Sequence, residues 1–224
     1  SLKYSALVRV NHEGGSLRGE GIALSFRQCS SVTLLVNART NYRQHHSSGW
    51  RGSDPAPVLK REMQRLEKKS FIELRDRHIA EFSRLTLAAG IDIGSSSPYL
   101  LQLTTDERLK QYASGGNDPD LEETLFQYGR YLLISSSRPP GLPANLQGLW
   151  NHSNQPPWAS DYHNNINLQM NYWSAETTNL PECHQPLISF ISANLNPCRD
   201  ATRTAFGDTL KGCATRTNTT KCGG

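Results

Sequence analysis

The first part of the chain has the apolar/polar alternation of β-strands. Residues 4–10 alternate in this way and place four apolar side chains on one face, namely Tyr4, Ala6, Val8 and Val10. Glu-Gly-Gly at 13–15 predicts a turn. Apolar runs at 21–26 and 31–36 predict two more strands. Three strands bury little surface on their own, so we expect them to be the end of a β-sandwich that begins upstream.

Helical patterns follow a polar loop at 40–57. His45-His46 lies in this Gly- and Ser-rich loop, where adjacent histidines are usually solvated rather than bound to metal. Asp54-Pro55 predicts a helix start, and Ser70 with Glu73 forms a capping-box pattern before the next helix. Four residues share one face of that helix: Leu74, His78, Phe82 and Leu85. We expect His78 to be a core or interface residue rather than a ligand.

The clearest helix signal comes next. Asp118-Pro119 followed by acidic residues predicts a capped helix that runs through Leu133 and ends at 135–141. A long loop separates it from a second helical pattern beginning near 164, which has apolar spacing at Ile166, Met170, Trp173 and Thr177. Pro181 is expected to stop this pattern, and another helix is expected over 186–196.

Composition and charge exclude several classes of protein. The 24 basic and 20 acidic residues give a net charge of +4, spread along the chain, which does not predict a nucleic-acid partner. No apolar run approaches the roughly 18 residues of a membrane span. The N-terminus has neither an initiator Met nor a signal peptide, so we expect a piece of something longer.

The five cysteines do not form a metal-binding pattern. They lack a Cys-x-x-Cys pair, so isolated thiols are favoured over a metal site. A disulfide among the last three, Cys198, Cys213 and Cys222, is the alternative. We expect no metal and no other cofactor.

The loop over 136–167 holds most of the candidate chemistry. It contains two tryptophans, Trp150 and Trp158, and several amides: Asn145, Gln147, Asn151, Asn154 and Gln155. Aromatic faces stack on sugar rings, and amides both donate to and accept from hydroxyls. Long loops of this kind are usually functional, which suggests a carbohydrate site. The alternative, a rim that packs its own aromatics, is equally compatible with the composition.

His163, Asn165 and Asn167 form a His-x-Asn-x-Asn pattern. In an extended segment, alternate residues point the same way, so all three would face one pocket. If a helix begins by 164, the two asparagines diverge by about 200° and one becomes an N-cap. From these residues alone, the N-cap interpretation is the better one.

Two long stretches also carry a family resemblance. "LFQYGRYLLISSSRPPGLPANLQGLWN" (125–151) and "PPWASDYHNNINLQMNYWSAETTNLPECHQPL" (156–187) resemble glycoside hydrolase family 95, the inverting α-L-fucosidases. Weaker likeness extends over 32–42 and 70–85. It fades over 202–224, where Cys213 stands in place of an expected aromatic.

The resemblance implies an α+β multidomain fragment. It assigns 1–55 to the end of a β-sandwich, 56–112 to a helical linker, and 113–224 to the opening helices of an (α/α)6 barrel that holds the active site. Secretion is expected from the family alone.

The resemblance also implies an exo-acting α-L-fucosidase that releases terminal α-1,2-linked L-fucose with inversion. Asn165 and Asn167 would hold the attacking water, His163 would contact fucose hydroxyls, and Trp150 and Trp158 would shape the pocket. An amide oxygen becomes more basic when its NH₂ is bonded to a carboxylate, so a partner Asp is implied.

In the family, this Asp and the general-acid Glu lie well downstream of the opening helices, so we expect the chain alone to be inactive. Glu176 and Glu182 are not expected to donate the proton. The substrate would be a fucosylated oligosaccharide or xyloglucan. A non-catalytic carbohydrate-binding remnant and an α-L-galactosidase of the same family are the alternatives.

Overall fold

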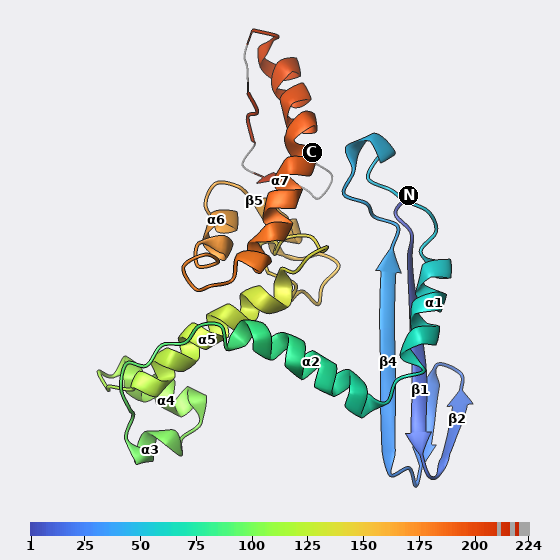
Figure 1. Ribbon diagram of the computed structural model, residues 1–224, viewed down its shortest axis with the longest axis vertical. Helices are drawn as coiled ribbons and strands as arrows, with labels where there is room; N and C mark the ends of the chain where they lie inside the picture. Colours follow the sequence, from blue (N-terminus) through green and yellow to red (C-terminus); the bar gives the residue numbers. More distant parts are fainter. Residues whose placement is uncertain (210–211, 216–217, 220–224) are drawn as a thin grey trace. The chain divides into compact units, whose positions relative to one another are not determined.

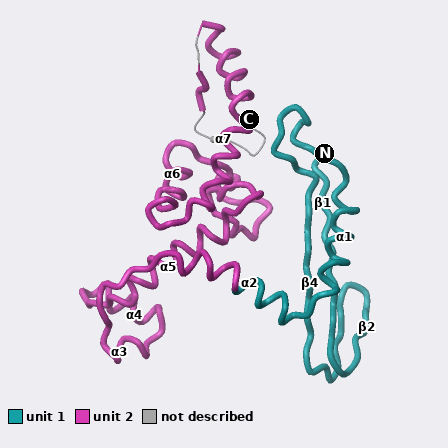
Figure 2. The backbone as a smooth tube through the Cα atoms, viewed as in Figure 1, with its two compact units in different colours: residues 1–79 teal, residues 80–224 magenta. Residues whose placement is uncertain are grey.

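The computed structural model describes residues 1–209, 212–215 and 218–219. The chain divides into two compact units, Ser1–Ile79 and Ala80–Gly224 (Figure 2). The first unit holds strands, a short 3-10 helix, one complete α-helix and the first part of the next, and the second unit is mainly helical (Figure 1). The mixed α and β content agrees with the predicted class.

The first unit is built on two antiparallel strand pairs. β1 (Tyr4–Glu13) pairs with β4 (Ser31–Thr40), and β2 (Ser16–Glu20) pairs with β3 (Ala23–Arg27). The sequence pattern missed β2, whose alternation is interrupted by charged residues and a glycine. The chain bends at Gly14-Gly15, as Glu-Gly-Gly predicts. Gly15 has φ +56°, and an added Cβ would lie 2.0 Å from the carbonyl oxygen of Arg27.

The register of β1 on β4 places apolar side chains of the predicted face opposite apolar side chains of β4. Val8 lies opposite Val36, and Val10 lies opposite Leu34. A short 3-10 helix, His46–Ser48, precedes α1 (Ala56–Leu66), and Ala56 N–H donates to Asp54 at 2.9 Å. α1 contacts β1 and β4, where Glu62 accepts hydrogen bonds from Arg39 and Asn37.

α2 (Phe71–Thr86) begins at the predicted cap, where the N–H of Glu73 donates to Ser70 Oγ at 3.1 Å. Leu85 is buried and Phe82 is half-buried, as the stripe predicts. His78, however, is exposed, so the core alternative was wrong, and its expected place at an interface stays a prediction. The predicted apolar face of α2 is only partly covered by other residues, so its N-terminal part lies at the surface.

The second unit begins with helices that the sequence pattern did not resolve. These are α3 (Pro98–Leu101) and α4 (Thr105–Ala113), the latter capped by Thr104 and Glu107. α5 (Pro119–Ser136) confirms the predicted helix, with Asp118 at its N-cap. At its other end Arg138 forms ion pairs with Glu81 and Glu182, as expected for a cation near a helix terminus.

The core of this unit joins α5 to α6 (Asn167–Tyr172) and α7 (Pro181–Phe206), with the loop between α5 and α6 closing over it. That loop carries a 3-10 turn, Pro157–Ser160, and β5 (Tyr162–His163), which pairs with β6 (Asn218–Thr219). The buried cluster is Leu85, Leu133, Ile134, Ala144, Tyr162, Leu168, Tyr172, Ala175, Leu180, Cys183, Leu187 and Phe190.

Two helix predictions need correction. Ile166, Met170 and Trp173 are exposed, while Leu168 and Tyr172 on the other face of α6 are buried. The apolar residues that predicted this helix therefore lie on the exposed face of α6. α7 begins at Pro181 rather than near residue 186, because proline is well tolerated at the first turn of a helix.

The cysteines also differ from the favoured expectation of isolated thiols. Cys198 and Cys213 form a disulfide, which was the alternative. Cys29 is a half-buried free thiol, and Cys183 is a free thiol with no exposed surface. Burial raises the pKa of the Cys183 thiol to about 11, so this group is a poor nucleophile at neutral pH. Cys222 lies outside the described residues.

Asp118 joins α4 to the start of α5. Its carboxylate accepts hydrogen bonds from Nε of Arg108 at 2.9 Å, from the hydroxyl of Ser96, and from the N–H of Leu121 at 3.2 Å. The Arg108 guanidinium is the main reason that the pKa of Asp118 lies far below its usual range. The carboxylate therefore stays ionised in the folded state at pH values where the unfolded chain binds a proton.

This depressed pKa predicts a pH-dependent stability. Asp118 stabilises the fold fully above the pKa of about 3.9 of an unfolded Asp, and its contribution is lost as the pH falls toward the folded pKa. We expect Asp118→Asn to lower the denaturation midpoint at pH 6 and to lower it less at pH 3. Urea titrations at both pH values measure this. An equal loss at both pH values would contradict the assignment.

Candidate active site

The loop after α5 is attached to the core by a chain of buried hydrogen bonds. The backbone N–H of Ala144 donates to the hydroxyl of Tyr172 at 2.7 Å. That hydroxyl lies 2.7 Å from Oγ of Ser137, which in turn donates to the carbonyl of Cys183 at 2.7 Å. The chain joins the loop to α5, α6 and α7, so Tyr172 fixes the start of the loop against the helix that follows it.

Asn145 organises the loop further along. Its Oδ1 accepts from the N–H of Gln147 at 2.9 Å and from the hydroxyl of Ser160 at 3.0 Å. Its carbonyl accepts from Asn171 of α6 at 2.9 Å. These contacts bring the two ends of the loop together. They show that Asn145 stabilises the loop, whereas composition alone would have made it a substrate-binding residue.

Trp158 lies at the rim of the loop in an unusual conformation. Trp158, Ala159 and Ser160 have φ of 55°, 55° and 48°, a region that non-glycine residues enter rarely. Such residues each cost about 1–3 kcal/mol and cluster at ligand sites. The indole is 75% exposed, and its edge packs on the ring of His163 with centroids 6.0 Å apart.

His163 lies beneath Trp158 and beside an acid. Nδ1 of His163 is 2.5 Å from Oδ1 of Asp161, and the two side chains are only 12% and 13% exposed. Asp161 was not among the predicted site residues. The Asp-x-His spacing was the available signal, because alternate residues of an extended segment face the same way.

Asn165 and Asn167 follow His163 at the surface. The extended segment ends at His163, residues 164–166 form a turn, and Asn167 is the first residue of α6. Both asparagines are exposed. The N-cap position of α6 belongs to Ile166, so neither asparagine has the capping role that the residues alone favoured.

Trp150 lies elsewhere on the loop. It is 49% exposed, and a Cβ added at Gly148 would come within 2.6 Å of its ring. Gly148, with φ +68°, therefore lets the indole fold back on its own turn. In the described part of the chain, Trp150 makes no ring contact with Trp158 or His163. The structure thus brings Trp158 and His163 together and leaves Trp150 apart from them.

The two nearby glutamates already have side-chain partners. Glu182 bonds Arg84 at 2.7 Å and Arg138 at 2.9 Å, and these guanidinium groups, Arg84 first, lower its pKa. A proton donor needs a raised pKa, so Glu182 is unsuited to that role. Glu176 is largely exposed and lies 2.8 Å from Nδ1 of His184.

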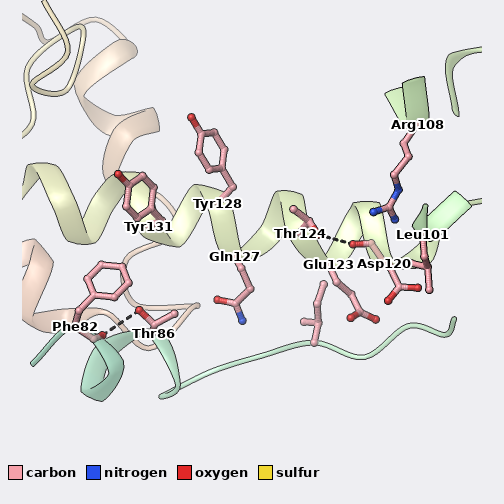
Figure 3. A pocket seen from close by; sticks show the side chains of 11 residues that line it. Phe82, Thr86, Leu101, Arg108, Asp120, Glu123, Thr124, Gln127, Tyr128 and Tyr131 are labelled. Carbon is pink, nitrogen blue, oxygen red and sulfur yellow. Dashed lines mark hydrogen bonds between the residues drawn. The ribbon is translucent and has the colours of Figure 1, made fainter. Parts of the chain in front are cut away.

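A groove on the opposite part of α5 is separate from these residues (Figure 3). Tyr128 and Tyr131 stack in it, with ring centroids 5.9 Å apart. Its polar side chains are already bonded to the protein: Gln127 donates to Ala89, and Glu123 accepts from Ile93. Its lining is Phe82, Thr86, Ile91, Leu101, Arg108, Asp120, Glu123, Thr124, Gln127, Tyr128 and Tyr131.

The residues that the structure describes contain neither a metal-binding cluster nor a membrane-spanning helix. No group of three or more His, Cys, Asp or Glu side chains there is arranged to hold a metal ion. None of the helices there is long and apolar enough to cross a bilayer.

An exposed indole beside a partly buried histidine and carboxylate, followed by two exposed amides, offers a ring face and hydrogen-bond partners for hydroxyls on one segment. Comparison with known families identifies the class of protein. The glycosyl hydrolase family 95 catalytic domain matches residues 70–223. The chain therefore belongs to glycosyl hydrolase family 95.

Curated relatives carry fucosidase names. The chain is 39% identical over 190 residues to alpha-L-fucosidase 2 of Arabidopsis thaliana, covering 83% of this chain and 22% of the relative. It is 39% identical over 175 residues to a probable alpha-fucosidase A of Aspergillus niger, covering 74% and 21%. Against the Aspergillus oryzae protein of the same name, identity is 34% over 206 residues, covering 88% and 28%. The chain thus spans only about a fifth to a quarter of these relatives.

Proposed function

We propose that the protein containing this chain is an exo-acting α-L-fucosidase that releases terminal α-1,2-linked L-fucose with inversion. The observation that carries the proposal is the family 95 match over residues 70–223, which includes the His-x-Asn-x-Asn segment. The fucosidase names of the curated relatives support the choice of sugar. The substrates are fucosylated oligosaccharides or xyloglucan.

In this proposal, Asn165 and Asn167 hold the attacking water. Inversion requires a water on the face of the sugar opposite the leaving oxygen and a proton donor on the leaving-group side. An exposed amide oxygen accepts a hydrogen bond from water and orients its lone pair, and both asparagines are exposed. His163 binds sugar hydroxyls, while Trp158 and Trp150 shape the pocket.

We assign no proton donor within residues 1–224. Glu182 is held ionised by Arg84 and Arg138, and Glu176 is paired with His184. The donor and the carboxylate that polarises the asparagines are proposed to come from a further part of the protein. We therefore expect the 224 residues alone to release no fucose.

Proton NMR of 2′-fucosyllactose tests the proposal. The protein that contains this chain is expected to release fucose with the β anomer appearing first, and the isolated 224 residues are expected to release none. If the α anomer appears first, the mechanism is not inversion. Faster release of L-galactose from a matched substrate would identify an α-L-galactosidase. Binding of fucose by the longer protein without hydrolysis would indicate a non-catalytic remnant.

A further inference from the structure

We infer that Asp161 is a positioning residue: it holds a proton on Nδ1 of His163, so that Nε2 is free to accept a hydrogen bond from a sugar hydroxyl. The inference rests on the proposed function, since His163 is taken as the residue that touches substrate. It assigns a role to an acid that the sequence pattern left outside the site.

The distance between the two side chains requires a proton. Nδ1 of His163 and Oδ1 of Asp161 are 2.5 Å apart. Two bare lone pairs at that separation would repel each other, so one atom has to carry a hydrogen. Both atoms are buried, and among the described residues neither has a partner in good hydrogen-bond geometry, each other included, so the contact is close but not aligned. A proton on Nδ1, with a small turn of either side chain, is the arrangement that satisfies both atoms.

The backbone fixes the direction of this contact. The carbonyl of Asp161 accepts from the N–H of Leu146 at 3.0 Å. His163 is held in β5, opposite Asn218 of β6. The ring of Trp158 lies nearly perpendicular to the imidazole, with the two planes at 87°, and covers one side of it. With Nδ1 turned toward Asp161, the ring geometry directs Nε2 away from the acid.

The chemical consequence is that Nε2 of His163 can accept a hydrogen bond but cannot donate one. In neutral imidazole one nitrogen donates and the other accepts, and the partner of the first sets the role of the second. The arrangement selects a ligand group that donates, such as a sugar hydroxyl.

A second histidine–carboxylate pair provides a control within the same chain. Nδ1 of His184 lies 2.8 Å from Oε1 of Glu176, so the chemistry is the same. This pair is more open, with His184 28% and Glu176 60% exposed. Glu176→Gln removes the same charge from a histidine partner outside the candidate site.

The tautomer can be read directly. We would label the protein that contains this chain with ¹⁵N-histidine and assign His163 from the spectrum of His163→Gln. The expected spectrum has the proton of His163 on Nδ1 in the wild type, and shows its loss or redistribution to Nε2 in Asp161→Asn. A wild-type proton on Nε2 would overturn the inference, whether or not the protein cleaves fucosides.

A double-mutant cycle tests whether Asp161 acts through His163. We expect Asp161→Asn to lower kcat/KM roughly 10- to 100-fold, the range seen for carboxylates that orient histidines, mainly by raising KM. The double variant Asp161→Asn/His163→Gln should be no worse than His163→Gln alone. Additive losses would show that the two side chains act separately. Glu176→Gln should leave both constants unchanged.

The two proposals fail in different ways. A wild-type protein that releases no fucose would refute the proposed function while leaving the tautomer measurement in force. A wild-type protein that is active, with additive losses in the cycle, would refute the role of Asp161 and leave the fucosidase assignment standing.

Discussion

Asn165→Ala and Asn167→Ala are each expected to lower kcat for fucose release by about 100- to 10,000-fold, the usual contribution of a general base, in the protein that contains this chain. An alanine cannot accept the hydrogen bond that orients the water, and KM should change little because water, rather than sugar, is the partner that is lost. Initial rates of fucose release from 2′-fucosyllactose measure the effect.

The matched control for these variants is Asn196→Ala. Asn196 is an exposed asparagine on α7, so the substitution removes the same side chain from the surface of a helix. Its kcat should equal that of the wild type. A loss of less than threefold in both Asn165→Ala and Asn167→Ala would contradict the water-holding role.

Arg130→Met is expected to destabilise the second unit by about 3–5 kcal/mol. Arg130 is 2% exposed, and its guanidinium donates to the carbonyls of Leu85, Thr86, Ala89 and Thr178. α2 ends at Thr86, so the cation satisfies the Thr86 carbonyl that the helix leaves without a partner. The Leu85 and Ala89 carbonyls also accept from the N–H of Ala88 and from Gln127, so the variant leaves mainly the Thr86 and Thr178 carbonyls unpaired. Each buried carbonyl left unpaired costs about 1–3 kcal/mol, partly offset where water enters.

The charge of Arg130 is stabilised by backbone carbonyl dipoles rather than by a carboxylate. Among the described residues it forms no ion pair, and burial lowers its pKa. Arg130→Lys keeps the charge but loses the planar arrangement of donors, so it should recover only part of the stability. The result would separate the contribution of the hydrogen bonds from that of the charge.

Urea denaturation followed by tryptophan fluorescence measures both Arg130 variants. Lys110→Met is the control, because Lys110 makes only an exposed ion pair with Asp106, 3.8 Å away. Such pairs contribute less than about 0.5 kcal/mol. If Arg130→Met and Lys110→Met denature at the same midpoint, the carbonyl-binding role of Arg130 is wrong.

The parts of the fold that the sequence predicted are those with strong local signals. Asp118-Pro119 before a run of apolar residues predicted α5 because a side-chain cap and a fixed φ act within one turn. β2 was missed because Gly19 and two charged residues interrupt its alternation. The face of α6 was misassigned because Leu168 and Tyr172 become buried through contacts with distant helices, which periodicity cannot reveal.

The site was predictable in its residue types but not in its contacts. The His-x-Asn-x-Asn segment stood out in the sequence, and the structure places both asparagines at the surface beyond His163. Asp161 was overlooked although its Asp-x-His spacing was visible, and the three left-handed residues before it are a conformation that no local propensity predicts. Asn145 resembled a ligand-binding amide, but it stabilises the loop.

The two free thiols of the described residues can report local unfolding of the core. Cys183 has no exposed surface and a raised pKa, so a thiol reagent reaches it only when the core around Tyr172 and Phe190 opens. Cys29, in the first unit, is half-buried and meets the reagent without such an opening. The ratio of the two labelling rates therefore measures the free energy of opening of the core on which the candidate site is built.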